Sequence, residues 1–204
     1  MNMSISSFIQ QCRHLRNTVI STYGKGVRSW FNYIYYALFR INKFKILMAS
    51  LEIPLEDGIV PFGIDLLNPP INELECLRSK DKFPREFFCD QFQKVKNCMI
   101  ALIDGELAYI HWVYYKGDFS RFLSIGSDSA EINYVITMPK HRGRGISTAA
   151  FMITLQNLKK QGLKKVYAVV HEENIASIKS FTRAGFVEVG TTVSLGPFNR
   201  KVSV

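Results

Sequence analysis

Between residues 130 and 171 the sequence changes from an extended to a helical pattern and back, and this constrains the fold more than any other feature. The β-rich run AEINYVITMP ends at Pro139. The run GISTAAFMITLQNLKKQG, residues 145–162, is typical of a helix with lysines in its last turn and a glycine after it. The short apolar run KKVYAVVH, residues 164–171, indicates a buried strand. A strand–helix–strand unit requires a sheet with a helix packed on it.

The turn that joins the first strand to the helix reads KHRGRG and has the composition of an anion-binding loop. The first N–H groups of a helix lack acceptors within the helix, and the helix dipole makes that end positive. Gly143 and Gly145 let a ligand approach the main chain, and Arg142 or Arg144 supplies positive charge. We therefore expect a phosphate or diphosphate at this turn.

Two common phosphate-binding motifs do not match this turn. A P-loop has four residues between its glycines, whereas only Arg144 separates Gly143 from Gly145. The dinucleotide fingerprint GxGxxG requires a third glycine where Thr148 stands. A basic loop can also bind nucleic acid, but no aromatic residues alternate with the basic ones here, so a nucleic-acid partner is disfavoured.

The remaining patterns surround this unit with further strands and helices. We expect a strand from residue 44 to Pro54, a Gly/Pro-rich loop, helices over 71–81 and 84–97, and a hairpin at Asp104-Gly105. After the strand–helix–strand unit, Asn174 is expected to cap a helix that ends at Gly185, and a final strand follows. This order predicts an α/β fold (α+β mixed sheet) with helices on both faces of the sheet.

Two motifs in this arrangement resemble the GNAT superfamily of acetyl-CoA-dependent N-acetyltransferases. In the family's pyrophosphate loop, Q/R-x-x-G-x-G/A, Arg142 and Gly145 match and Ser147 stands where Gly or Ala is usual. The family's later motif, N-x-x-A-x-x-x-Y-x-x-x-GF, corresponds here to Asn174, Ser177, Phe181 and Gly185-Phe186. The resemblance is specific over about residues 130–190 and implies a GNAT-like N-acetyltransferase domain over residues 44–204.

The resemblance implies that acetyl-CoA binds at this turn as the acyl donor. The main chain of Ile136, Thr137 and Met138 would pair with the pantetheine arm where the sheet splays apart. The pyrophosphate would be held by the N–H groups of Arg142, Gly143, Arg144, Gly145, Ile146 and Ser147. Three further residues would line the cofactor site, namely Asn174, Ser177 and Phe181.

Acyl transfer from a thioester to an amine requires a neutral amine, a stabilised oxyanion and a departing thiolate. The resemblance implies that Glu131, at the start of the central strand, is the general base. His111, on the neighbouring strand, is the alternative because its usual pKa is near neutral. The family's usual acid, a tyrosine, is Phe181 here, which cannot donate a proton. Either the thiolate leaves unaided or a nearby hydroxyl replaces this acid, the candidates being Ser177, Ser180 and Tyr134.

Residues 1–43 lie outside the resemblance and form a basic amphipathic segment that is predicted to be helical. Residues 1–50 hold seven Lys or Arg and no acidic residue, so +7 of the net charge of +9 lies in the first quarter of the chain. Three roles fit this composition: helices packed on the domain, peripheral contact with an anionic membrane, or a cleaved organellar presequence. No uncharged run approaches the ~20 residues that a spanning helix needs.

The cysteines and histidines indicate neither a disulfide scaffold nor a metal site. Cys12, Cys76, Cys89 and Cys98 are irregularly spaced, which favours reduced thiols in a cytoplasmic protein. The four histidines show no metal-ligand spacing, so no metal is expected.

These features predict an N-acetyltransferase that transfers an acetyl or other acyl group from acetyl-CoA to a primary amine. The acceptor class stays open between a small molecule, an amino sugar and a protein amine. The alternative is a GNAT-like module that binds coenzyme A with weak or no catalysis and is tethered to a membrane or partner by residues 1–43.

Overall fold

The computed structural model describes residues 26–28, 30–31, 41–55, 58, 60–79, 82–195, 198–199 and 202–204. The chain divides into two compact units, of which the larger comprises residues 43–192 and 200–204 and the smaller residues 1–42 and 193–199. Most of the basic segment, residues 1–43, lies outside the described residues, so its predicted helices and the domain boundary after residue 43 stay predictions. No helix of the described ranges is long and apolar enough to cross a membrane.

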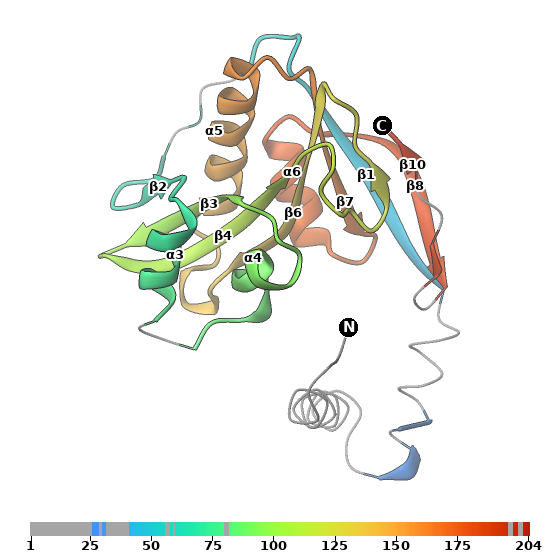
Figure 1. Ribbon diagram of the computed structural model, residues 1–204, viewed down its shortest axis with the longest axis horizontal. Coiled ribbons are helices and arrows are strands. Elements are labelled where there is room, and N and C mark those ends of the chain that lie inside the picture. The colour runs from blue at the N-terminus through green and yellow to red at the C-terminus, as the bar shows by residue number, and fades with distance from the viewer. Residues whose placement is uncertain are drawn as a thin grey trace. The chain divides into compact units, whose positions relative to one another are not determined.

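In the described part of the chain, seven strands lie in the order β2-β3-β4-β6-β7-β1-β8 in one mixed sheet (Figure 1), and the two-residue strand β9 (Phe198–Asn199) is its eighth, beyond β8. The pairs β2–β3, β3–β4, β4–β6 and β1–β7 are antiparallel, whereas β6–β7 is parallel. The Asp104-Gly105 turn between β3 and β4 has φ angles of 52° and 76°, as a tight hairpin with two left-handed residues requires. The strands are β1 (Ile41–Ser50), β2 (Asp65–Leu67), β3 (Asn97–Ile103), β4 (Glu106–Tyr114), β6 (Ser129–Thr137), β7 (Lys165–His171) and β8 (Val187–Leu195).

Three short strands add local pairs. β9 (Phe198–Asn199) pairs with the end of β8, and β10 (Val202–Ser203) pairs with β5 (Leu123–Ser124). None of these pairs, nor β2, was expected from the sequence, because strands of two or three residues carry too little alternation to be recognised.

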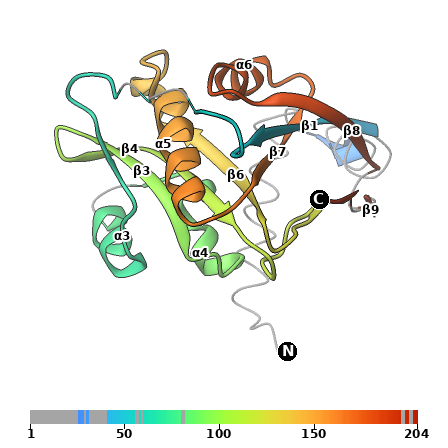
Figure 2. The ribbon, with the colours of Figure 1, turned by 90° about the horizontal axis from the view of Figure 1, so that it is seen from above.

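Two helices cover one face of the sheet, which we call the α5 face (Figure 2). α5 (Ile146–Lys160) follows the short 3₁₀ turn η2 (Pro139–His141), and α6 (Ile175–Arg183) follows β7. Phe151 of α5 and Phe181 of α6 belong to one buried cluster with Val166 and Ala168 of β7. The burial of these apolar side chains holds both helices on the sheet.

The opposite face, which we call the α4 face, is covered by α3 (Ile71–Arg78), the 3₁₀ turn η1 (Arg85–Phe88) and α4 (Cys89–Phe92). Arg78 of α3 forms a buried two-pronged ion pair with Asp90 of α4, at 2.6 and 2.9 Å. Trp112 of β4 donates from Nε1 to the Glu86 carbonyl of η1 at 2.8 Å. These polar contacts fix the short helices against one another and against the sheet.

The structure confirms the predicted mixed sheet with helices on both faces, the hairpin, the strand–helix–strand unit and the helix capped by Asn174. The predicted helix over 84–97 is wrong beyond Phe92, since Lys94 takes a φ of 58° and β3 begins at Asn97. The aromatic and apolar residues of this segment are buried against the sheet, but they do so from two short helical turns and not from one continuous helix.

Candidate active site

The parallel pair β6–β7 opens toward its C-terminal end. The two strands pair only where Ser129, Ala130 and Glu131 face residues 165–167. Beyond this point β6 continues to pair with β4 as far as Thr137, while β7 pairs with β1 as far as His171. The sheet therefore splits between its two central strands, and each strand keeps its outer neighbour.

A β-bulge at Tyr134 accompanies the split. The β4–β6 register runs from Trp112 opposite Asn133 to Ile110 opposite Ile136, so β6 carries one extra residue there. Tyr134 takes a φ of 48°, and the Asn133 side chain accepts from the Tyr134 N–H at 2.8 Å. A left-handed residue within a strand bends it and increases its twist, which turns the end of β6 away from β7.

The open edge of β6 presents the main chain of Val135 and Thr137. The Met138 N–H donates to the carbonyl of Ala108 in β4, so the main chain of Met138 and, two residues earlier, of Ile136 faces β4. The Thr137 carbonyl faces the other way and accepts from Arg142 Nε at 3.2 Å. Of the segment predicted to pair with a ligand, Thr137 therefore lies on the open edge together with Val135, whereas the main-chain groups of Ile136 and Met138 face β4.

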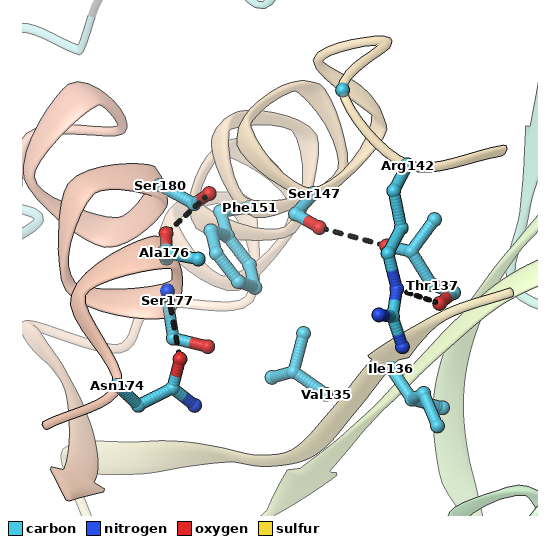
Figure 3. A pocket seen from close by; sticks show the side chains of 11 residues that line it. Val135, Ile136, Thr137, Arg142, Ser147, Phe151, Asn174, Ala176, Ser177 and Ser180 are labelled. Atoms are coloured by element: carbon cyan, nitrogen blue, oxygen red, sulfur yellow. Dashed lines mark hydrogen bonds between the residues drawn. The ribbon is translucent and has the colours of Figure 1, made fainter. Parts of the chain in front are cut away.

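A cleft of about 370 Å³ lies at this opening (Figure 3). It is bounded by the end of β6, the start of α5 and the start of α6. Its lining residues are Val135, Ile136, Thr137, Arg142, Gly143, Ser147, Phe151, Asn174, Ala176, Ser177 and Ser180. A second hollow of about 130 Å³ shares Thr137, Gly143, Ser147 and Ser180 with it and adds Arg144 and Arg183.

The N-terminus of α5 forms the upper wall of the cleft. Gly143 and Gly145 take φ angles of 77° and 76°, which a residue with a side chain adopts only with strain. The first main-chain bond of the helix is from the Ala149 N–H to the Gly145 carbonyl, and no side chain caps the helix. The N–H groups of Ile146, Ser147 and Thr148 therefore have no helical acceptor, as an anion site requires.

The start of α6 forms the opposite wall. Asn174 Oδ1 accepts from the Ser177 N–H at 3.2 Å, which is the expected N-cap. Asn174 and Ser177 both line the cleft, as expected from the sequence (Figure 3). Phe181 does not line it, because this side chain is 2% exposed and stacks on Phe151 at a ring-centroid distance of 4.0 Å. The aromatic wall of the cleft is Phe151 instead.

Glu131 lies at the closed end of the split, on the α4 face. It is 1% exposed, and its Oε1 accepts from Asn133 Nδ2 at 3.1 Å. Its partners across the strands are Tyr114 and Tyr167, which belong to the apolar cluster of the α4 face. A carboxylate in this position can take a proton from a group that enters between the strands from the α4 face.

Tyr134 lies on the same face, and a glutamine fixes its hydroxyl. Gln93, at the end of α4, donates from Nε2 to the Tyr134 hydroxyl at 2.7 Å and accepts from Tyr114 at 3.0 Å. Burial raises the pKa of Tyr134, so the phenol stays protonated. Sequence reasoning missed Gln93, since nothing in a segment expected to be one helix distinguishes it from its neighbours.

His111 lies within the core under α5 and not at the opening. It is fully buried, with Nδ1 2.7 Å from the Tyr109 hydroxyl and Nε2 3.1 Å from Thr154 Oγ1. Burial lowers the pKa of His111 to about 3, so the ring is neutral near pH 7. Because both ring nitrogens are engaged and the ring does not line the cleft, this placement favours a structural role over that of general base.

The remaining nucleophiles and possible metal ligands do not gather at the cleft. Burial raises the pKa of the Cys89 and Cys98 thiols to about 12, which keeps both thiols protonated. Within the described ranges, no three His, Cys, Asp or Glu side chains come together as a metal site would require.

A known protein family matches this chain over the segment that forms the cleft. The family model described as "Acetyltransferase (GNAT) family" matches residues 70–186, more than half of the chain. No protein of curated function matches the sequence.

Several solved structures share the fold. A putative GNAT-family acetyltransferase from Novosphingobium aromaticivorans has a TM-score of 0.57 at 17% identity, covering 76% of this chain and 64% of its own. A GCN5-related N-acetyltransferase from Sphaerobacter thermophilus has a TM-score of 0.54 at 16% identity, and the match covers 81% of this chain and 55% of that protein. A GNAT-family acetyltransferase from Colwellia psychrerythraea has a TM-score of 0.54 at 15% sequence identity. The match covers 90% of this chain and 71% of that protein. The chain thus spans less than two thirds of the first two proteins.

The burial of His111 predicts a defined dependence of stability on pH. The unfolded chain protonates this ring at its usual pKa of 6.5, whereas the folded protein keeps it neutral down to about 3. The unfolded state therefore binds more protons in this window, and the free energy of unfolding falls as pH falls from 6.5 toward 3. Urea titrations of His111→Gln should show a shallower fall than the parent between pH 6.5 and 4.5. Parallel curves for the two proteins would contradict the assignment.

Proposed function

Since the chain belongs to the acetyltransferase (GNAT) family, we propose that it transfers an acetyl group from acetyl-CoA to a primary amine, and that the cleft between β6 and α6 holds the donor. The observation that carries this proposal is the convergence of three features on one cleft. They are the open strand edge at Val135 and Thr137, the uncapped start of α5, and the capped start of α6.

The residues present fit coenzyme A. The cleft of about 370 Å³ is within the usual range of small-molecule sites, about 300–1,000 Å³, and the smaller hollow that shares four of its lining residues adds about 130 Å³. The N–H groups of Ile146, Ser147 and Thr148 would hold the diphosphate, with Arg142 and Arg144 supplying counter-charge. The main chain of Val135 and Thr137 would pair with the amides of the pantetheine arm. When bound, acetyl-CoA supplies an activated thioester.

Glu131 is the proposed general base. An acceptor amine that enters from the α4 face meets this carboxylate at the closed end of the split, next to the bulge. The carboxylate accepts the amine proton, directly or through a water molecule, and leaves a neutral nucleophile. A main-chain N–H on the open edge, at Val135 or Thr137, would donate to the oxyanion that then develops.

Tyr134 is the proposed proton donor to the departing thiolate, in the place of the family's usual tyrosine. Its hydroxyl oxygen accepts from Gln93, which leaves its own proton for another acceptor. Phe181 is excluded from this role by its chemistry and by its place in the core.

The second candidate function is a module that binds coenzyme A with weak or no catalysis. It is favoured by Phe181, which cannot donate a proton and stands where the family usually has a tyrosine. The two candidates differ in turnover: the enzyme releases free thiol from acetyl-CoA when an acceptor amine is present, and the module binds coenzyme A with no such release. In either case the amine that acts as acceptor belongs to a small molecule, an amino sugar or a protein.

Gly145→Glu should abolish binding of coenzyme A, because a carboxylate at the start of α5 repels the diphosphate and fills its site. Isothermal titration calorimetry measures the loss. Gly117→Glu is the matched control, since Gly117 also has a positive φ, of 100°, in open space but lies outside the cleft. Circular dichroism should show both variants folded. Equal affinity of Gly145→Glu and the parent would contradict the proposed donor site.

Glu131→Gln should lower kcat by about 10²-fold or more, because the amide cannot take a proton and a general base typically contributes a factor of this size. An assay of the free thiol released from acetyl-CoA measures kcat. The Kd for acetyl-CoA should change little, since Glu131 does not line the donor cleft. Raising the pH should partly restore the rate by deprotonating the amine in solution. A variant with the parent's kcat would exclude Glu131 as base.

Peripheral membrane contact through residues 1–43 is a further part of the proposal, supported by their basic and amphipathic composition. The full chain should sediment with vesicles that contain phosphatidylserine, and less with neutral vesicles. Replacing Arg13, Arg16, Lys25 and Arg28 with glutamine should release the protein from these vesicles, because each basic residue near the surface contributes about 1 kcal/mol to the binding free energy. Equal sedimentation of the parent and this variant would contradict membrane contact.

A further inference from the structure

Half-buried apolar side chains lie on both sides of the split between β6 and β7, on the α4 face. Side chains two residues apart share one face of a strand. On the β6 side, Tyr134, Ile136 and Met138 pack against the apolar cluster of the α4 face and keep part of their surface exposed. On the other side, Val169 of β7 and Phe44 of the neighbouring β1 do the same.

This apolar surface connects the donor cleft with the proposed base. Ile136 lines the donor cleft. Tyr167 pairs with Glu131 at the closed end of the split, and Val169 follows two residues later on the same face of β7. An amine that reaches Glu131 from the α4 face would therefore place the rest of its molecule against these apolar side chains.

The split has one carboxylate on its two strands, which suits an acceptor with a single ammonium group. Within β6 and β7, all of whose residues are described, Glu131 is the only acidic side chain. On the helices that cover this face, Asp90 is already held by Arg78 in a buried ion pair. A polyamine would bring further ammonium groups next to apolar side chains, where an unpaired charge is costly.

The polar side chains beside the split are bound to one another. The Gln93 amide donates to the Tyr134 hydroxyl and accepts from Tyr114. The Asn133 amide donates to Glu131 and accepts from the Tyr134 N–H. The hydroxyls of an amino sugar would lose water here and find few new partners, which disfavours such an acceptor.

We propose that the acceptor is a primary monoamine carried on an apolar body, for which an aromatic ring is the best fit. The inference rests on the proposed function and names the acceptor class for the same site. Burial of the apolar body against the two sides of the split favours binding. The rings of Tyr134 and Phe44 offer faces and edges to an aromatic acceptor.

The transfer to such an amine balances with the groups already assigned. The ammonium gives one proton to Glu131, its nitrogen forms a bond to the acetyl carbon, and the carbon–sulfur bond breaks. Tyr134 gives a proton to the departing thiolate, and the second proton that the nitrogen loses replaces it. The products are an N-substituted acetamide, free coenzyme A and one released proton.

A comparison of acceptors with the full chain tests the class, with release of thiol from acetyl-CoA as the readout. The kcat/KM for 2-phenylethylamine should exceed the values for spermidine and glucosamine by about tenfold or more, because buried polar groups without partners are strongly disfavoured. A peptide with N-terminal phenylalanine distinguishes a protein terminus from a small amine as the source of the apolar body. Preference for spermidine or glucosamine would overturn the inference.

The isosteric variant Val169→Thr tests the surface itself. It should raise the KM for 2-phenylethylamine severalfold, because a hydroxyl replaces a methyl group against the apolar body. The Kd for coenzyme A should not change, since Val169 does not line the donor cleft. Val187→Thr is the matched control, because this valine of β8 is 58% exposed and lies outside the split. An unchanged KM in Val169→Thr would count against the inference.

Failure of the inference and failure of the proposed function give different results. If the parent binds coenzyme A in calorimetry and prefers a polar acceptor, this inference is wrong and the proposed acetyl transfer stands. If the parent binds coenzyme A and acetylates none of the four acceptors, the inference is wrong and the binding module is supported. If the parent binds no coenzyme A, both the proposed function and this inference fail.

Discussion

The separation of β6 from β7 is the structural feature on which the whole site depends. The bulge at Tyr134 turns β6 outward while β4 and β1 hold the outer edges of the two strands. The separation leaves the main-chain groups of Val135 and Thr137 on an open edge inside the sheet. Such groups are costly to leave without a hydrogen-bond partner, so this edge favours a ligand that can pair with it.

The split also joins the two faces of the sheet, which have different chemistry. On the α5 face lie the uncapped helix start, the arginines and the cap at Asn174, which suit an anionic donor. On the α4 face lie Glu131 and the Tyr114–Gln93–Tyr134 network, which suit proton transfer. The Arg78–Asp90 ion pair fixes the short helices that carry Gln93. A reaction between two substrates that arrive from opposite faces fits this arrangement.

Features that depend on local chemistry could be predicted from the sequence. Asp104-Gly105, the glycines before α5 and the Asn174 cap each specify their own backbone geometry, and the structure confirms all three. Features that depend on distant contacts could not be predicted. The burial of His111 comes from α5 packing over β4, and the place of Phe181 comes from its stack on Phe151. Val135 lies on the open edge because of the bulge at Tyr134. The local sign of this bulge in the sequence is Asn133 within a β-rich run, whose side chain accepts from the Tyr134 N–H.

The central claim is that the first turn of α5 holds the diphosphate of coenzyme A. A crystal structure of the protein grown with coenzyme A tests it most directly. The account predicts diphosphate oxygens about 3 Å from the main-chain nitrogens of Ile146, Ser147 and Thr148, a normal hydrogen-bond distance. A complex in which the diphosphate lies elsewhere, with Arg142 still on the Thr137 carbonyl and the start of α5 unused, would contradict it.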